Sequence, residues 1–121
     1  MPLNKNITHI YEPTPLQCGQ AVLAMLTGKS VVEIVSFLNN ERETTFKEMV
    51  DTLEFNGINC SKTRISVNKK EELPKACFLS LETPKCWHWS MYVNGIFYDP
   101  DYGVLDDFPP SNRKFYWEII K

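Results

Sequence analysis

Apolar residues recur at helical intervals through the first half of the chain. The segment CGQAVLAMLTG, which begins at Cys18, is apolar nearly all round, and Gly28 follows where a left-handed C-cap is expected. Pro13 and Pro15 stand shortly before this segment, and proline fixes φ and restricts the residue that precedes it. The pattern therefore predicts a buried helix that begins at Cys18 and ends at Gly28.

Two further helices are predicted by a pair of N-terminal caps. Ser30 and Thr45 are each followed three positions later by a glutamate, which is the spacing of a capping box. Apolar residues then recur at helical spacing, up to Asn39–Asn40 after the first cap and up to Gly57 after the second. The first half of the chain is thus expected to hold three helices.

Beyond Gly57 the pattern becomes typical of strands. Residues 58–67 (INCSKTRISV) alternate and are rich in β-branched side chains. Residues 76–82 (ACFLSLE) form a short apolar run between two prolines. Residues 115–120 (FYWEII) predict a last strand, which we expect to pair inside the sheet.

The clearest strand signal is the segment WHWSMYVNGIFYDP, residues 87–100. Two aromatic-rich runs are joined there by Asn94-Gly95, a dipeptide that favours the type I′ turn because both central positions of that turn need positive φ. The segment predicts an antiparallel hairpin. Helices first and antiparallel strands afterwards indicate an α+β domain, in which N-terminal helices pack on a C-terminal antiparallel sheet.

Composition and charge limit the class of protein. The chain has 121 residues, of which 43% are hydrophobic, and this predicts one domain over residues 1–121. Its 13 basic and 15 acidic side chains form no long run, so neither nucleic acid nor an anionic membrane is an expected partner. Because the sequence shows neither an apolar stretch of roughly 18 residues nor the apolar core of a signal peptide, we expect a cytoplasmic protein.

The cysteines do not show the spacing of a metal or redox motif. They are Cys18, Cys60, Cys77 and Cys86, and they form neither a CxxC sequence nor pairs. Cys86 and His88 lie two apart on one strand face, but the sequence offers no second pair of ligands. We therefore expect neither a metal nor a cofactor.

The predicted hairpin brings a histidine close to a carboxylate. With Asn94-Gly95 as the two loop residues, His88 faces Asp101 directly and Asp99 diagonally. All three side chains project to the same face, since strand residues two apart share a face. Pairing is expected to end at Pro100, which has no N–H to donate, and this favours Asp99 as the partner of the imidazole.

Cys18 stands at the start of the first predicted helix. Unpaired N–H groups and the helix dipole at that position favour a thiolate. Taken one at a time, Cys18, His88 and Asp99 are more simply explained by core packing or turn capping. Together they have the residue types of a nucleophile, a base and a group that orients the base, which suggests a catalytic triad.

The two segments PTPLQCGQAVLAMLTG and WHWSMYVNGIFYDP resemble the papain-like cysteine peptidases, in particular the bacterial peptidase C39-like group. The resemblance extends over residues 12–103 in element order. It implies the papain-like fold, with Cys18 as nucleophile, His88 as general base and acid, and Asp99 as the group that orients the imidazole. In this family the oxyanion hole usually takes the cysteine backbone N–H and a glutamine side chain six residues upstream.

The chain departs from the family pattern at the oxyanion position. Glu12 stands six residues before Cys18, and an ionised carboxylate only accepts hydrogen bonds. Gln17 or Gln20 would be alternative donors, or Glu12 would have to be held protonated. The resemblance thus predicts a thiol hydrolase that acts on a peptide or protein substrate through an acyl-enzyme. Alternatives are an acyltransferase or deamidase with the same nucleophile, and a catalytically weak peptide-binding module.

The remaining aromatic and histidine residues are expected to have structural roles. Strand alternation places Trp87 and Trp89 on the face opposite His88, where we expect them to pack in the core, as does Trp117. His9 lies far in sequence from the hairpin and is expected to be exposed to solvent.

Overall fold

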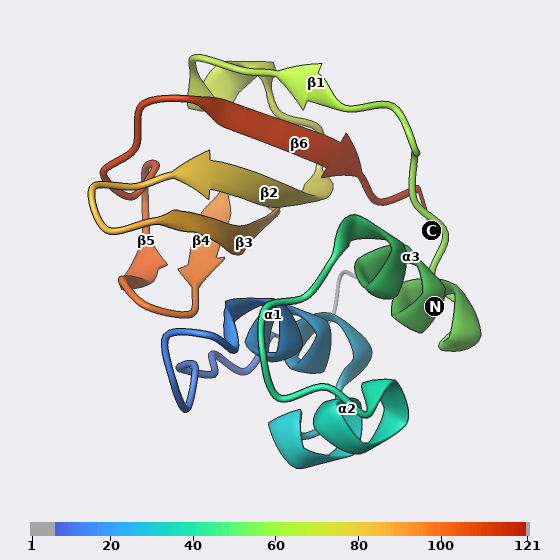
Figure 1. Ribbon diagram of the computed structural model, residues 1–121. Helices are drawn as coiled ribbons and strands as arrows, with labels where there is room; N and C mark the ends of the chain where they lie inside the picture. Colours follow the sequence, from blue (N-terminus) through green and yellow to red (C-terminus); the bar gives the residue numbers. More distant parts are fainter. Residues whose placement is uncertain (1–6, 121) are drawn as a thin grey trace.

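Within residues 7–120, the part of the chain that the computed structural model describes, three α-helices precede an antiparallel sheet of six strands (Figure 1). The helices are α1 (Cys18–Thr27), α2 (Val31–Leu38) and α3 (Phe46–Phe55). The strands are β1 (Ile65–Ser66), β2 (Ala76–Glu82), β3 (Trp87–Val93), β4 (Ile96–Asp99), β5 (Gly103–Leu105) and β6 (Lys114–Glu118), with a 3₁₀ turn at Lys70–Glu72. The predicted α+β class is confirmed.

The helix ends are set by local chemistry, as the sequence predicts. The hydroxyl of Ser30 accepts the N–H of Glu33 at 3.1 Å, and the Glu33 carboxylate accepts the N–H of Ser30 at 2.9 Å. Thr45 makes the same reciprocal box with the glutamate three positions on, at the start of α3. Gly28 ends α1 in the left-handed conformation, with φ of 78°.

The helices are short. Among the described residues, no single helix is long and apolar enough to cross a membrane. α1 and α2 reach the necessary length and composition only as a pair, which is bent by 111°.

The sheet has the strand order β1-β6-β2-β3-β4-β5, and every neighbouring pair is antiparallel. The predicted hairpin forms β3 and β4, with Asn94 and Gly95 both at positive φ. Its register pairs Val93 with Ile96 and Tyr92 with Phe97, as the two-residue turn predicts. The last strand, β6, lies between β1 and β2, and this confirms that it pairs inside the sheet.

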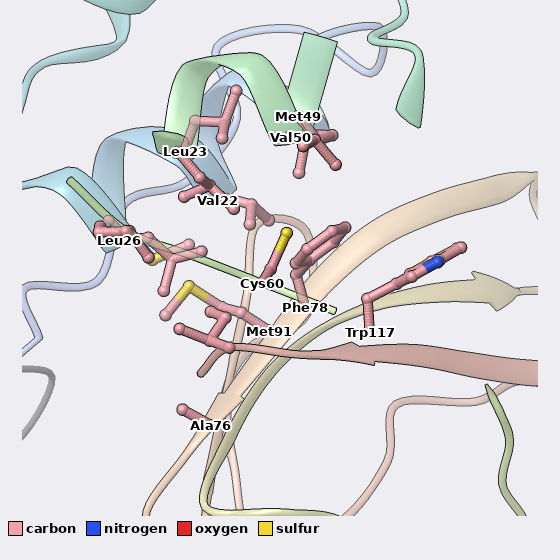
Figure 2. Packing of buried hydrophobic residues seen from close by; sticks show 14 of the residues in the cluster. Val22, Leu23, Leu26, Met49, Val50, Cys60, Ala76, Phe78, Met91 and Trp117 are labelled. Carbon is pink, nitrogen blue, oxygen red and sulfur yellow. The ribbon is translucent and has the colours of Figure 1, made fainter. Parts of the chain in front are cut away.

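The main core lies between the helices and one face of the sheet. In Figure 2, Val22 and Leu26 of α1 and Met49 of α3 point toward Phe78 and Met91 of the central strands. Each of these five side chains is 1% exposed or less, so the helices bury the apolar face that the sequence pattern assigns to them. This packing holds α1 against β3, which is the contact that the candidate site depends on.

A smaller cluster fills the opposite face of the sheet. It consists of Cys77, Leu79, Leu81, Tyr92 and Phe97, and the partly buried side chains around it are Leu73, Leu105, Phe108 and Tyr116. The central strands β2 and β3 are therefore buried on both faces, which explains why β2 reads as an apolar run and not as an alternation.

One strand prediction needs correction, and one strand was not predicted. Residues 58–67 form a strand only at Ile65–Ser66, with an isolated bridge from Cys60 to Ile119. Both residues of β1 are exposed and pair with β6 alone, because the segment runs along the edge of the sheet. The sequence pattern also gives no sign of β5 (Gly103–Leu105), which is three residues long and pairs with β4.

Candidate active site

Cys18 is the first residue of α1, and its surroundings follow from that position. The first helical hydrogen bond runs from the N–H of Ala21 to the carbonyl of Gln17, at 3.1 Å. The N–H groups of Cys18, Gly19 and Gln20 therefore precede the hydrogen-bonded part of the helix. Such a helix N-terminus stabilises negative charge placed near it. Cys18 itself is 9% exposed.

The sulfur of Cys18 lies against the edge of β3. The N–H of Trp89 points to Sγ at 3.4 Å, as a backbone donor to the sulfur. The ladder between β3 and β4 covers only Tyr92 and Val93 on β3, so it ends before it reaches Trp89. The start of α1 thus takes the place beside β3 that a longer β4 would occupy, and this brings Cys18 to the strand that carries His88.

His88 is held by a bidentate contact with Asp99. Its Nε2 lies 2.9 Å from Oδ1 and 2.8 Å from Oδ2, and the two side chains are almost fully buried. Oδ1 also accepts the N–H groups of Asp101 and Tyr102, both at 2.9 Å. Because an ionised carboxylate only accepts hydrogen bonds, we assign the proton on Nε2 to His88 as the donor. Asp99 therefore fixes the plane of the imidazole.

The choice between the two predicted acids is settled by these contacts. Asp101 lies beyond Pro100 and pairs with Lys85, with 3.0 Å between its Oδ2 and Nζ. Asp99 is the residue bound to His88, as predicted, although pairing between β3 and β4 ends at Tyr92 and Phe97 and not at Pro100 as expected.

Cys18, His88 and Glu12 come together at one point. One ring nitrogen of His88, Sγ of Cys18 and one carboxylate oxygen of Glu12 all lie within 4.8 Å of one another. Since Nε2 is bound to Asp99, we assign Nδ1 as the ring nitrogen that faces the sulfur. The three residues of the predicted triad are thus within reach of one another in the order sulfur, imidazole, carboxylate.

The charged forms of His88 and Asp99 stabilise each other. Burial lowers the pKa of His88, but the hydrogen bonds with Asp99 and Cys18 outweigh this effect and raise the pKa to about 10. For Asp99, burial raises the pKa, but the hydrogen bond and charge of His88, with the two backbone donors, hold it below its usual value. The site therefore favours an imidazolium between a carboxylate and the sulfur at neutral pH.

A backbone hydrogen bond holds Glu12 at the same site. Its N–H donates to the carbonyl of Pro100 at 2.9 Å, which ties the segment before α1 to the turn after β4. Oε1 is buried and has no hydrogen-bond partner among residues 7–120. Burial raises the pKa of Glu12, His88 opposes the rise, and the neighbouring carboxylates of Asp101 and Asp99 add to it. The balance favours the protonated carboxyl more than in an ordinary glutamate.

His9 belongs to this site as well, although the sequence predicts an exposed residue. Its Nε2 lies 2.7 Å from the backbone carbonyl of Asp99, and its ring packs edge-on against Tyr11, with 4.4 Å between centroids. The residue is partly buried. The prediction is wrong because the segment before α1 folds back over the end of β4, a contact between residues ninety positions apart that the sequence pattern does not reveal.

A cleft of about 270 Å³ opens beside the sulfur. It is lined by Cys18, Glu43, Thr44, Ser80, Trp87, His88 and Trp89. One wall is the loop before α3, and this loop lies directly on α1 at Gly19, where a Cβ atom would come within 2.6 Å of Cβ of Thr44. A glycine is needed there because the loop and the helix approach so closely.

Gln20 holds that loop and is not an oxyanion donor. Its side-chain N–H₂ donates to the carbonyls of Asn40 and Arg42, at 3.0 and 2.7 Å, and its oxygen accepts the hydroxyl of Thr44 at 3.0 Å. The residue is fully buried, and these bonds use both of its amide hydrogens. The prediction that Gln20 could donate to an oxyanion is therefore corrected: it positions the wall of the cleft.

Gln17 occupies the N-cap position of α1, directly before Cys18. It is 8% exposed, and its side chain makes no capping hydrogen bond to the helix. Glu12, also proposed from the sequence for the oxyanion position, has a carboxylate oxygen within 4.8 Å of both the Cys18 sulfur and a ring nitrogen of His88.

The two tryptophans beside His88 have different roles. Trp89 packs in the main core, with its ring 5.8 Å from that of Phe78, and its indole N–H donates to the carbonyl of Thr44 at 2.9 Å. Trp87 is 45% exposed and stacks on Phe115 and Arg113, so the expectation that it lies in the core is wrong. It is the first residue of β3, beyond the part of the sheet that the main core reaches.

No protein-family model matches this chain, and no curated protein matches it significantly.

Proposed function

We propose that this protein is a thiol hydrolase that cleaves a peptide or amide bond with Cys18 as nucleophile, in a papain-like fold of the C39-like type. The observation that carries the proposal is the convergence of Cys18 and His88 within 4.8 Å, with Asp99 bound to the far side of the imidazole. A nucleophilic thiol at a helix N-terminus, a base within reach and a buried acid behind the base form the arrangement needed for acyl transfer.

The reaction follows from the position of the proton. Transfer of the thiol proton to Nδ1 of His88 gives the imidazolium that the site favours, and the Cys18 sulfur then attacks the carbonyl carbon to give a tetrahedral oxyanion. When the C–N bond breaks, Nδ1–H of His88 protonates the leaving amine, and a thioester remains on Cys18. His88 then takes a proton from water, the resulting hydroxide attacks the thioester, and the acid is released as the thiol re-forms.

Glu12 is proposed to complete the oxyanion hole. The backbone N–H of Cys18 precedes the hydrogen-bonded part of α1 and is one donor. Burial raises the pKa of Glu12, which favours the protonated carboxyl, and the O–H of that form is the proposed second donor beside the sulfur. This assignment gives the unpartnered buried Oε1 a function in the transition state.

The architecture supports the papain-like assignment. α1 presents Cys18 at its N-terminus to the antiparallel sheet, and the sheet supplies His88 from β3 and Asp99 from β4. The cleft beside the sulfur is open and lined by the loop before α3, which suits an extended peptide segment or the amide of a protein side chain. A peptide or protein is therefore the proposed substrate.

Selective alkylation tests the proposed nucleophile. We expect iodoacetamide to modify Cys18 faster than Cys86 near pH 6 by about tenfold or more, because a ring nitrogen of His88 lies within 4.8 Å of the Cys18 sulfur and can take the thiol proton. Cys60 and Cys77 should react slowest, since burial raises the pKa of both thiols. The measurement is peptide mapping by mass spectrometry after timed alkylation.

The exposed cysteine provides the internal reference. In urea, where the fold is lost, Cys18 and Cys86 should react at similar rates. If Cys18 follows the rate and pH profile of Cys86 in the native protein as well, the sulfur is an ordinary thiol and the hydrolase proposal is wrong.

Substitution of Glu12 tests whether the protein cleaves its substrate or binds a peptide without cleaving it. We expect Glu12→Ala to lower kcat about 10²–10³-fold, the usual effect of removing one oxyanion donor. Glu12→Gln should retain kcat within about tenfold, because an amide N–H₂ also donates. Wild-type activity should fall as pH rises through the raised pKa of Glu12, whereas the Gln variant should lack this loss. The measurement is the pH profile of acyl-enzyme turnover.

A different result would favour the alternative function. If Glu12→Gln increases kcat by about a hundredfold, Glu12 is ionised in the native site and opposes the oxyanion. The natural chain would then be better described as a peptide-binding module with a weak thiol activity. Hydrolase, acyltransferase and deamidase are distinguished by adding a primary amine to the acyl-enzyme and by assaying released ammonia.

A further inference from the structure

The cluster of Cys18, His88 and Glu12 has the composition of a metal site as well as that of a catalytic one. A thiolate sulfur, an imidazole nitrogen and a carboxylate oxygen are the three ligand types that Zn²⁺ takes in proteins. The sequence does not show this set, because Glu12 and Cys18 lie far from His88 along the chain. The fold brings their ligand atoms within 4.8 Å of one another.

We propose that these three residues bind one Zn²⁺ ion and that the bound ion reversibly switches off the thiol. Zinc bonds of about 2.0–2.3 Å place neighbouring ligand atoms of a tetrahedral site roughly 3.3–3.8 Å apart. The observed separations exceed this by no more than about 1.5 Å, which rotation of the Glu12 and Cys18 side chains can close. The cleft beside Cys18 leaves the fourth position open to water.

The groups around the cluster fit a bound cation. Asp99 holds the far nitrogen of His88, and a carboxylate in this position orients a metal-bound imidazole and strengthens it as a ligand. The backbone N–H of Trp89 lies 3.4 Å from Sγ and can donate to a metal-bound thiolate. Oε1 of Glu12 is buried and without a hydrogen-bond partner in the described part of the chain, so a cation would supply the missing interaction.

Charge balance also favours a divalent ion. A thiolate and a carboxylate together neutralise Zn²⁺, and the neutral imidazole completes the set. The proton shared by Cys18 and His88, and the carboxyl proton of Glu12, leave to solvent when the metal binds. With its sulfur and Nδ1 both on the metal, the site has neither a nucleophile nor a base. The inhibition rests on the proposed hydrolase function, whereas the binding does not.

Calorimetric titration of the full chain with zinc chloride tests the site. We expect one ion per chain, with at least about tenfold weaker binding for Glu12→Gln, which keeps the size of the side chain but replaces the carboxylate by an amide. Co²⁺ in place of zinc should give a thiolate-to-metal charge-transfer band that Cys18→Ala abolishes. Cys86→Ala, which removes an exposed cysteine, should bind zinc as the wild type does.

Inhibition is measured separately. Zinc should protect Cys18 from iodoacetamide while Cys86 stays reactive, and a chelator should restore the reaction. Zinc affinity unchanged by Glu12→Gln, or a cobalt band that persists in Cys18→Ala, would overturn the proposed site. If zinc binds through these residues but no acyl-enzyme ever forms, the hydrolase proposal fails and the metal site stands. If an acyl-enzyme forms but zinc does not bind, the metal site is wrong and the hydrolase proposal stands.

Discussion

Cys18→Ala is expected to reduce turnover by about 10⁶-fold, the loss seen when the nucleophile of a triad is removed. The remaining groups can still bind substrate but cannot form the thioester. Acetylation by p-nitrophenyl acetate, followed by intact-protein mass spectrometry, should label the wild type at Cys18 and leave the variant unlabelled there. Hydrolysis of a peptide library, quantified by mass spectrometry, measures the loss of turnover.

The fold should survive this substitution. Sγ is 3.4 Å from one backbone donor and Cys18 is at the rim of the core, so we expect the free energy of unfolding to change by about 1 kcal/mol or less. Cys86→Ala is the matched control, because it removes an exposed thiol and should keep full activity. Hydrolysis that persists in folded Cys18→Ala would assign the activity to another group.

Asp99→Asn is expected to lower kcat about 10⁴-fold while the protein stays folded. Oδ1 of Asp99 is fixed by the N–H groups of Asp101 and Tyr102, so the new amide N–H₂ would replace Oδ2 opposite Nε2 of His88. That change favours the imidazole tautomer with its proton on Nδ1, which cannot take the proton of Cys18. Single-turnover acylation rates measure the loss.

The pKa of His88 provides a second readout of the same substitution. It is raised from 6.5 to about 10 in the native site, so the charged imidazole stabilises the fold fully below about pH 6.5. This stabilisation is lost as pH rises through about 10. In Asp99→Asn the pKa should move back toward 6.5, as measured by NMR of imidazole-labelled protein in which His9→Gln leaves one histidine.

A surface carboxylate nearby gives the control. Asp101→Asn removes the exposed ion pair with Lys85 and should leave the pKa of His88 near its wild-type value. It should lower kcat by at most about tenfold, because the charge of Asp101 contributes to the raised pKa of Glu12. If Asp99→Asn behaves like Asp101→Asn in both measurements, Asp99 is a structural residue, and the sulfur and imidazole act without it.

Local elements of the fold were predictable because their signals are local. A capping box at Ser30 or Thr45 satisfies backbone donors within one turn, and Asn94-Gly95 fixes the hairpin within two residues. Residues 58–67 were not predictable in the same way. Their alternating pattern fits a strand, but the sheet offers them only β6 as a neighbour, and two residues pair.

In the candidate site, too, the features that depend on local sequence were predictable and those that depend on distant segments were not. The register of the hairpin was enough to place Asp99 near His88, and the helix start was enough to single out Cys18. The roles of Gln20 and His9 depend on segments that fold back from elsewhere: the loop before α3 in one case, the chain before α1 in the other. The nearby sequence of each residue contains no signal for these contacts.

The sequence by itself determined the α+β class, the three helices, the central hairpin and the candidate acid, because each depends on residues a few positions apart. Only the tertiary structure decided that the thiol of Cys18 meets His88 and that Glu12 meets both. Those contacts join the N-terminal segment, a helix start and a strand edge. They form because burying α1 against the sheet fixes the position of all three, and this burial depends on the shape of the whole core.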